Sequence, residues 1–276
     1  MTFEDVTVSG GEADQPVMTI DRFRMNAELA PYLSGEIRIF SMQLTRPVLT
    51  LVEGMPQPSV FPLPAPRVPT GAEVVLENVE IENGAIVFKD ADEAETARLS
   101  NIEAHFSAES LSGPFSGAGT FESLGDRVSF DLTTGRAEEG QATAMRVSLT
   151  SPAQSARLDL DGRLRSEDGT SLFEGRLSYA QPQPRIPDPN AGADVFAAMD
   201  GDADALRGSV APEPDEKPPV RADAEVVIRG DRLTTDALRV EVGPRAAPYV
   251  LTGGGRVDLV PTPRFDVTLE GEAFDV

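Results

Sequence analysis

The stretch LENVEIENGAIVFKD, residues 76–90, decides the fold predicted for this chain. Apolar and polar residues alternate in it with a period of two, which is typical of a strand with one buried face and one face in water. Its central dipeptide, Asn83-Gly84, is preferred for a two-residue hairpin turn, because both turn positions require a positive φ. A turn there would place four apolar residues on one face of the hairpin. They form two cross-strand pairs, Ile81 with Ile86 and Val79 with Phe88.

The same alternation recurs along most of the chain. Fully buried parallel strands would appear as continuous apolar runs separated by helices, and neither pattern occurs. Helical spacing is limited to two short segments, residues 27–34 and 194–207. The sequence therefore predicts an all-β fold, an elongated antiparallel sheet of repeated amphipathic hairpins that forms a curved groove or an open sandwich, with at most one or two short helices. Candidates for its apolar face are Val79, Ile81, Ile86, Phe88, Val128, Phe130, Leu132, Leu158, Leu160, Val257, Leu259, Phe265, Val267 and Leu269.

Two proline-rich stretches divide the chain, because proline cannot donate to a central strand and favours an extended linker. The sequence predicts an opening β segment over residues 1–54, a proline-rich linker over 55–70 and a main β region over 71–180. A proline-rich acidic linker, with room for one short helix, follows over 181–220. The C-terminal β segment, residues 221–276, is expected to pack on the same sheet.

The ionisable composition excludes several classes of function. The chain has one His and no Cys, so it has too few ligands for a His/Cys zinc site, no cysteine nucleophile and no disulfide. Its 46 acidic and 24 basic side chains give a formal net charge of −22. Such a surface repels phosphate, which argues against nucleic-acid binding and against adsorption to anionic lipid headgroups.

Motifs that resemble chemical sites have simpler structural explanations here. Residues 200–204 have the D-x-D-x-D spacing that begins a calcium loop, but the glycine and the glutamate that complete the motif are missing, which favours a solvated acidic loop. His105 alternates with apolar neighbours and is expected on the polar strand face. Asp159 and Asp161 flank Leu160 and are expected on a polar face as well. The triplet Gly253-Gly254-Gly255 indicates a turn or bulge. We therefore predict no catalysis, no cofactor and no metal site.

Four segments resemble the signatures of the AsmA family of bacterial envelope proteins, in the order in which that family has them. They are MTIDRFRMNAELAPYLSGEIRIFSMQLTRPVLTL (Met18 to Leu51), LENVEIENGAIVFKD (Leu76 to Asp90), LSNIEAHFSAESLSGPFSGAGTF (Leu99 to Phe121) and LTGGGRVDLVPTPRFDVTLEG (Leu251 to Gly271). The resemblance implies a periplasmic protein of the Gram-negative envelope, anchored in the inner membrane by one N-terminal helix. Larger members such as TamB and YhdP resemble bridge-like lipid-transfer proteins, in which repeated β units form an apolar groove. The anchor helix of the family is missing here, so we expect inner-membrane association through a segment absent from this chain.

Together, these patterns predict that the fourteen apolar candidates named above contact lipid, on a surface that binds or shields the acyl chains of phospholipid or another lipid. This surface would support phospholipid transport and outer-membrane assembly. The alternative is a non-catalytic structural module that contacts other envelope proteins through its sheet edges. An enzyme is the weakest of the three classes. The spacing of the apolar residues is the same in a lipid groove and in a closed sandwich core, so the pattern alone leaves that choice open.

Overall fold

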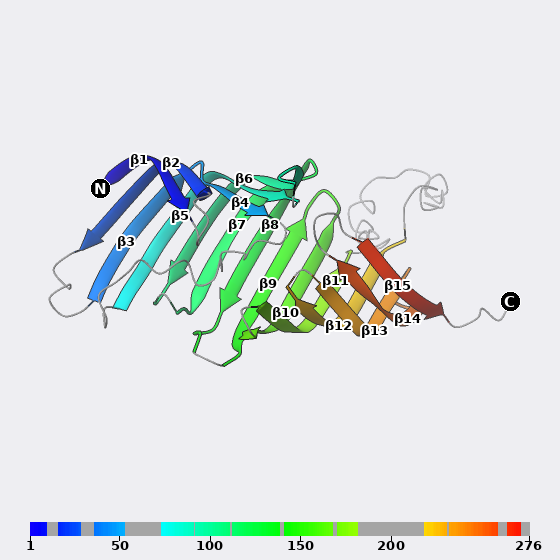
Figure 1. Ribbon diagram of the computed structural model, residues 1–276. Coiled ribbons are helices and arrows are strands. Elements are labelled where there is room, and N and C mark those ends of the chain that lie inside the picture. Colours follow the sequence, from blue (N-terminus) through cyan, green and yellow to red (C-terminus); the bar gives the residue numbers. More distant parts are fainter. Residues whose placement is uncertain are drawn as a thin grey trace, which may run out of the picture.

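In the computed structural model of the chain, the described residues form fifteen strands of one continuous sheet (Figure 1). The structure describes residues 1–9, 16–28, 36–52, 73–90, 92–110, 112–138, 141–167, 170–181, 218–230, 232–258 and 264–271. The strands are β1 (Thr2–Ser9), β2 (Pro16–Glu28), β3 (Glu36–Thr45), β4 (Val48–Val52), β5 (Glu73–Lys89), β6 (Glu95–Ala108), β7 (Phe115–Ser123), β8 (Asp126–Thr134), β9 (Thr143–Ser151), β10 (Ala156–Glu167), β11 (Thr170–Ala180), β12 (Val220–Arg229), β13 (Arg232–Val242), β14 (Tyr249–Asp258) and β15 (Arg264–Gly271).

The order of strands in the sheet follows the order in the sequence. It runs from β1 to β15, with β4 off the main path between β2 and β5. All pairs are antiparallel except β3 with β5 and β4 with β5, which are parallel. β12 pairs with β11, so the C-terminal strands extend the same sheet. The predicted all-β, elongated antiparallel architecture is confirmed.

Helices are absent from the described residues, and within them no helix is long and apolar enough to cross a membrane. The short helix expected over residues 194–207 lies outside the described part of the chain, as does the calcium-like segment 200–204. Of the other expected helical segment, residues 27 and 28 belong to β2, and the remainder also lies outside the described residues.

The prediction of a hairpin turn at Asn83-Gly84 is wrong. β5 runs straight through this dipeptide as one strand, so Ile81 and Ile86 lie on the same strand and do not pair with each other. Asn83 does have the positive φ that its sequence context suggested, at 54°, but it uses this conformation in a bulge. One extra residue on β5 shifts the alternation by one position, which produces the apolar pattern that a hairpin would also give.

Residues with positive φ are aligned across several neighbouring strands at this place. They are Asp5 in β1 (φ 53°), Arg46 between β3 and β4 (51°), Asn83 in β5 and Asn101 in β6 (49°). The strand register places them on one line. Asp5 and Arg46 lie on either side of Asp21 of β2, Arg46 and Pro47 lie opposite Asn83 and Gly84, and the extra residues on β5 and β6 compensate each other. Figure 1 shows β1, β2, β4 and the adjoining ends of β5 and β6 turned across the top of the molecule. We call this line of four residues the crease.

Glycines on one face let aromatic rings lie against the sheet. A Cβ on Gly117 would collide with the ring of Phe106, and a Cβ on Gly162 would lie 2.6 Å from Cζ of Phe173. Phe106 and Phe130 therefore meet across β7, with ring centroids 6.1 Å apart, although their strands are not neighbours. Rings that cover glycines in this way stabilise a sheet to which the described residues add no second layer.

Candidate functional site

One face of the sheet carries an unbroken row of apolar residues and glycines from β2 to β15. Each member is the direct register partner of the next, so the row crosses the strands at right angles. Its members, which we call the central row, are Met25, Met42, Val79, Phe106, Gly117, Leu132, Val147, Leu160, Leu177, Ala224, Leu238, Gly253 and Leu269. We call the face that carries it the inner face.

A second row runs beside the central row on the inner face and begins at β1. Its members are Phe3, Phe23, Leu44, Ile81, Ala104, Gly119, Phe130, Leu149, Leu158, Tyr179, Ala222, Val240, Leu251 and Gly271. None of the two rows' side chains is charged. At about 4.8 Å per strand, the fourteen strands of this row give an apolar face about 60 Å long.

The opposite, outer face is polar along the same path. On each strand, the residue between the members of the two apolar rows in the sequence points to this outer face. These residues also pair with one another from strand to strand, and they are Thr2, Arg24, Gln43, Glu80, His105, Ala118, Asp131, Ser148, Asp159, Ser178, Asp223, Arg239, Thr252 and Glu270. Apart from Ala118, the members of this row are polar or charged, so the charged side chains along this path lie on the face opposite the two apolar rows.

The inner face is only partly shielded from solvent. Strands in close contact are neighbours within the sheet, and all fifteen belong to that one sheet. Leu132, Val147, Leu160 and Leu177, at the middle of the central row, are each partly exposed. In a closed two-sheet sandwich these positions would form the dry core. Many of the buried side chains form two local clusters instead, one around Val79 and the other around Phe173, Ala224 and Val226.

The predicted apolar residues lie on several strands, and seven of the fourteen belong to the two rows. Val79 is buried, at 7% exposure, whereas Phe265 at the edge strand is 73% exposed. Val267 and Leu269 are also exposed. Leu259 lies outside the described residues. The other predicted residues are all partly buried: Ile81, Ile86, Phe88, Val128, Phe130, Leu132, Leu158, Leu160 and Val257.

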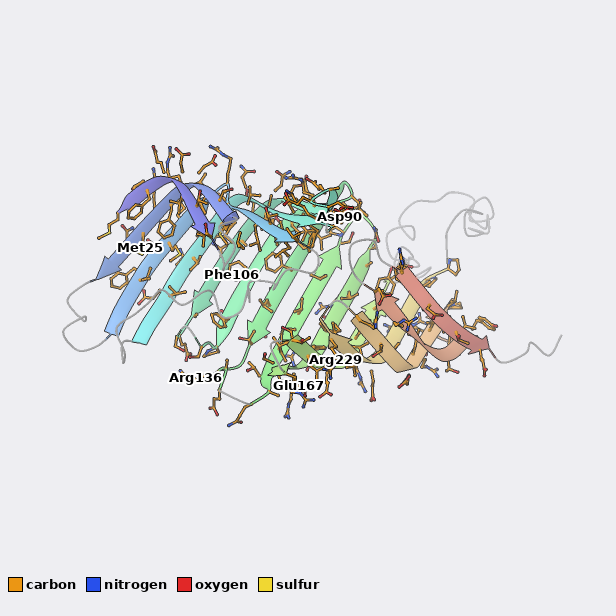
Figure 2. The ribbon with its side chains drawn as sticks, viewed as in Figure 1. Met25, Asp90, Phe106, Arg136, Glu167 and Arg229 are labelled. Atoms are coloured by element: carbon orange, nitrogen blue, oxygen red, sulfur yellow. The ribbon has the colours of Figure 1, made fainter. Side chains whose placement is uncertain are left out.

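Several inner-face residues were missing from the prediction. Met25 and Met42 belong to the central row and pack on the cluster around Val79, as does Phe106. Figure 2 shows Met25 and Phe106 on the side of the sheet toward which the upper strands turn. Alternation within β11, from Phe173 to Tyr179, was the signal that could have added this strand to the candidate face.

Beyond the crease, a shorter apolar row continues on the upper strands. It consists of Val8, Met18, Leu49, Ile86 and Leu99, all partly buried. Ser100 pairs with Glu122, the neighbour of the inner-face residue Phe121, so Leu99 faces inward. We call β4 and the ends of β1, β2, β5 and β6 beyond the crease the upper wall, and the remaining parts of those strands, with β3, the lower wall.

Ion pairs cover much of the outer face. Arg157 donates two hydrogen bonds to the carboxylate of Asp159, at 2.7 and 2.9 Å, and Ser148 donates a third at 2.6 Å. The bonds from Arg157, followed by that from Ser148, lower the pKa of Asp159 against the opposing effect of burial. Arg239 and then Arg221 lower the pKa of Glu241 in the same way. These groups stay charged at neutral pH and form a solvated exterior.

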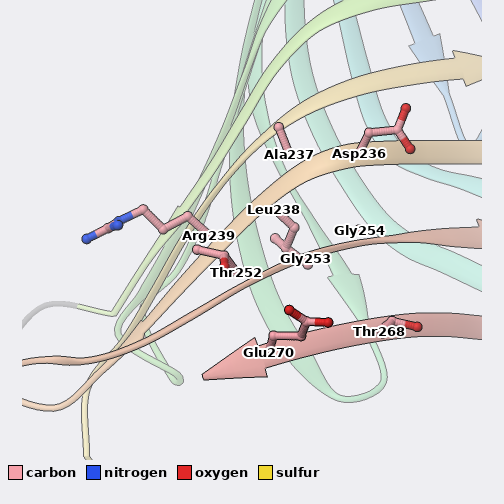
Figure 3. Close-up of a pocket in the computed structure, with 9 residues that line it drawn as sticks. All are labelled: Asp236, Ala237, Leu238, Arg239, Thr252, Gly253, Gly254, Thr268 and Glu270. Atoms are coloured by element: carbon pink, nitrogen blue, oxygen red, sulfur yellow. The ribbon is translucent and has the colours of Figure 1, made fainter. Parts of the chain in front are cut away.

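The outer face also has a shallow hollow of about 560 Å³ over β13, β14 and β15 (Figure 3). Asp236, Arg239 and Glu270 line it together with Thr252 and Thr268. Asp236 lies at a bulge of β13, opposite the glycine triplet of β14. Among the described residues, no three His, Cys, Asp or Glu side chains are grouped closely enough to hold a metal ion.

His105, the one histidine of the chain, is exposed on the outer face. Its register partners are Glu80 and Ala118, in agreement with the expected polar position. Asp159 and Asp161 also lie on the outer face, where Arg157 and Arg146 engage them.

Comparison with known proteins gives no match: no family model matches the chain, and no curated protein and no solved structure is significantly similar to it.

Proposed function

We propose that the inner face binds acyl chains of phospholipid or a similar lipid, as an AsmA-like segment on the periplasmic side of the inner membrane. There it would support phospholipid transport and outer-membrane assembly. One observation carries the proposal: two uncharged rows cross the whole sheet while their central members remain partly exposed. An exposed apolar surface of this extent is typical of a binding surface.

The energetics favour acyl chains as the ligand. Each buried methylene contributes about 0.8 kcal/mol, so a dozen methylenes against the rows contribute roughly 10 kcal/mol before the costs of association. That interaction needs no polar groups, and the inner-face rows have no charged side chain to offer. The charged outer face would keep such a protein in water while its inner face holds lipid.

The resemblance of four segments to the AsmA family supports the same reading, since that family's larger members resemble lipid-transfer proteins. The segments lie in β2 to β4, in β5, in β6 and β7, and in β14 and β15, so they cover both ends of the apolar rows.

A pair of matched charge substitutions tests the proposal. Leu132 belongs to the central row, and its neighbour Thr133 is exposed on the outer face. The full chain is incubated with vesicles of phosphatidylethanolamine and phosphatidylglycerol, repurified, and its bound lipid is measured by mass spectrometry. We expect bound lipid on the unmodified chain and on Thr133→Asp, and a loss of at least fivefold on Leu132→Asp. Lipid-free protein, or equal loss in both variants, would contradict the proposal.

The two edges of the sheet favour a second candidate function. Within the described residues, β1 and β15 each pair with one strand only, and every residue of β15 is exposed. An exposed edge can accept a strand from another protein, so contacts with other envelope proteins are the alternative. Recovery of a stable protein partner together with no bound lipid would favour this alternative.

A further inference from the structure

The crease brings two apolar surfaces toward each other at one end of the sheet. We propose that Asn83 and Asn101 are positioning residues that hold the upper wall at an angle to the lower wall, so that one acyl chain contacts both walls at once. This inference rests on the proposed function, because it names the place where a chain of that lipid would be held most firmly.

Backbone conformation supports this role for the crease. A left-handed conformation is costly for residues other than glycine, and here four such residues lie on one line that runs from β1 to β6. Bulges bend a strand and increase its local twist, so aligned bulges bend the sheet along one line. Asparagine tolerates this conformation better than most residues, which fits the choice at positions 83 and 101.

Side-chain bonds lie along the crease and tie it together. Asn101 donates a hydrogen bond from Nδ2 to the Glu122 carboxylate at 2.7 Å, and the backbone N–H of Asn83 donates to Glu103 at 3.0 Å. Arg46 binds Asp21 of β2 at 2.6 Å. These bonds cross from one strand to the next, so they hold the strands in a common bend.

Both walls present apolar rows to the angle between them. Met18, Leu49 and Ile86 belong to the row of the upper wall, and Leu44 and Ile81 belong to the second row on the lower wall. On a flat sheet, a chain lying across the strands would touch one surface. In the angle it touches two surfaces, so a larger part of its apolar area is removed from water.

The length of the crease suits one acyl chain. It runs over β1, β2, the joined β3 and β4, β5 and β6, which is about 20 Å at 4.8 Å per strand. One leaflet of a bilayer core is about 15 Å thick, so a membrane-lipid chain fits lengthwise.

An extended polypeptide suits the crease poorly. The interior strands there have neighbours on both sides, so they have no free edge with which to pair a peptide backbone. A peptide would bury its own N–H and C=O groups without partners, at a cost of several kcal/mol. An acyl chain has no such groups.

Cysteine labelling tests the inference directly, because the chain has no native cysteine. Separate Ile86→Cys and Phe106→Cys variants, one on each wall, carry a fluorophore and are titrated with a 16-carbon fatty acid bearing a nitroxide near its methyl end. A third label at Leu160→Cys, far along the central row, reports binding elsewhere. We expect both wall labels to be quenched at the same fatty-acid concentration, below the concentration that quenches the Leu160 label.

Backbone variants test the two asparagines. Asn83→Val with Asn101→Val disfavours the left-handed conformation, whereas Asn83→Gly with Asn101→Gly permits it. We expect the valine pair to weaken quenching at the Ile86 label at least tenfold and the glycine pair to preserve it. Circular dichroism checks the folding of both pairs, and the single valine variants replace the double variant if it does not fold.

The outcomes separate this inference from the proposed function. Quenching at Phe106 and Leu160 without quenching at Ile86 would overturn the two-wall site and leave lipid binding intact. A folded valine variant with unchanged quenching at Ile86 would overturn the role of the asparagines. No quenching at any label would overturn both the inference and the proposed function.

Discussion

A carboxylate at Phe130 should cost little stability beyond the loss of the ring contacts if the inner face is open. Phe130 lies in the second row, and its ring centroid is 6.1 Å from that of Phe106 and 6.2 Å from that of Phe121. Each aromatic pair contributes roughly 0.5–1.5 kcal/mol, so Phe130→Glu should lose about 1–3 kcal/mol from the two pairs. Because the site is partly exposed, the new carboxylate can remain hydrated. In a closed core, burial of an unpaired charge would add several kcal/mol more.

Urea unfolding followed by circular dichroism measures this difference. Phe130→Leu is the matched control, because it removes the same ring contacts without adding a charge. Leu172→Glu is the buried reference, since Leu172 is 1% exposed. We expect the free energies of unfolding of Phe130→Glu and Phe130→Leu to agree within about 1 kcal/mol, and Leu172→Glu to be severely destabilised. A Phe130→Glu protein that fails to fold, or that falls more than about 4 kcal/mol below Phe130→Leu, would refute the open face.

Three further predictions concern stability. A Cβ on Gly175 would lie 2.7 Å from Cα of Gly162, whereas one on Gly135 would have no atom nearer than 3.6 Å. In thermal unfolding, Gly175→Ala should therefore lower the free energy of unfolding by roughly 1–3 kcal/mol and Gly135→Ala by less than about 0.5 kcal/mol. Equal losses in the two variants would contradict the close packing at Gly175. Leu124 is fully exposed and has a φ of 53° in the turn before Gly125. Leu124→Asn should therefore raise the free energy of unfolding, measured with urea, by about 0.5–1 kcal/mol, and a decrease would contradict the turn geometry. The folded-state pKa of Asp159 is lowered, so its stabilising contribution is present above about pH 4 and is lost as the pH falls through that folded value. The stability gap between the unmodified chain and Asp159→Asn should then be largest at pH 7 and close in acid, and a gap that widens in acid would contradict this sign.

The sequence was sufficient for the fold class because alternation reports the environment of each side chain directly. Val128, Phe130 and Leu132 alternate with polar residues, and the structure places all three on one face. Turn chemistry was less informative. Asn83-Gly84 has the best turn signal in its region but lies inside a strand, while Leu124-Gly125, a poor turn sequence, makes the two-residue connection between β7 and β8. A positive φ suits both a turn and a bulge, and only long-range pairing decides between them.

The candidate face could be predicted residue by residue but not as a surface. Leu132 and Leu160 were both candidates, yet their alignment through Val147 depends on strand register, which local sequence does not determine. Glycine and alanine positions such as Gly117 and Ala224 were missed because small residues give no apolar signal, although they continue the central row. The crease could not be predicted at all, since it requires bulges in separate strands to coincide.

The one-dimensional pairing of the strands has a consequence for how such a chain can change its length. Within the described part of the chain, the extensive contacts of β9 and β10 are with each other and with the strands beside them. If both were deleted, β8 would meet β11 in the antiparallel sense, with Leu132 opposite Leu177 and Phe130 opposite Tyr179. The apolar rows would remain unbroken and the sheet would be about 10 Å shorter. Gain or loss of a hairpin therefore alters the reach of the molecule in discrete steps without requiring a new core.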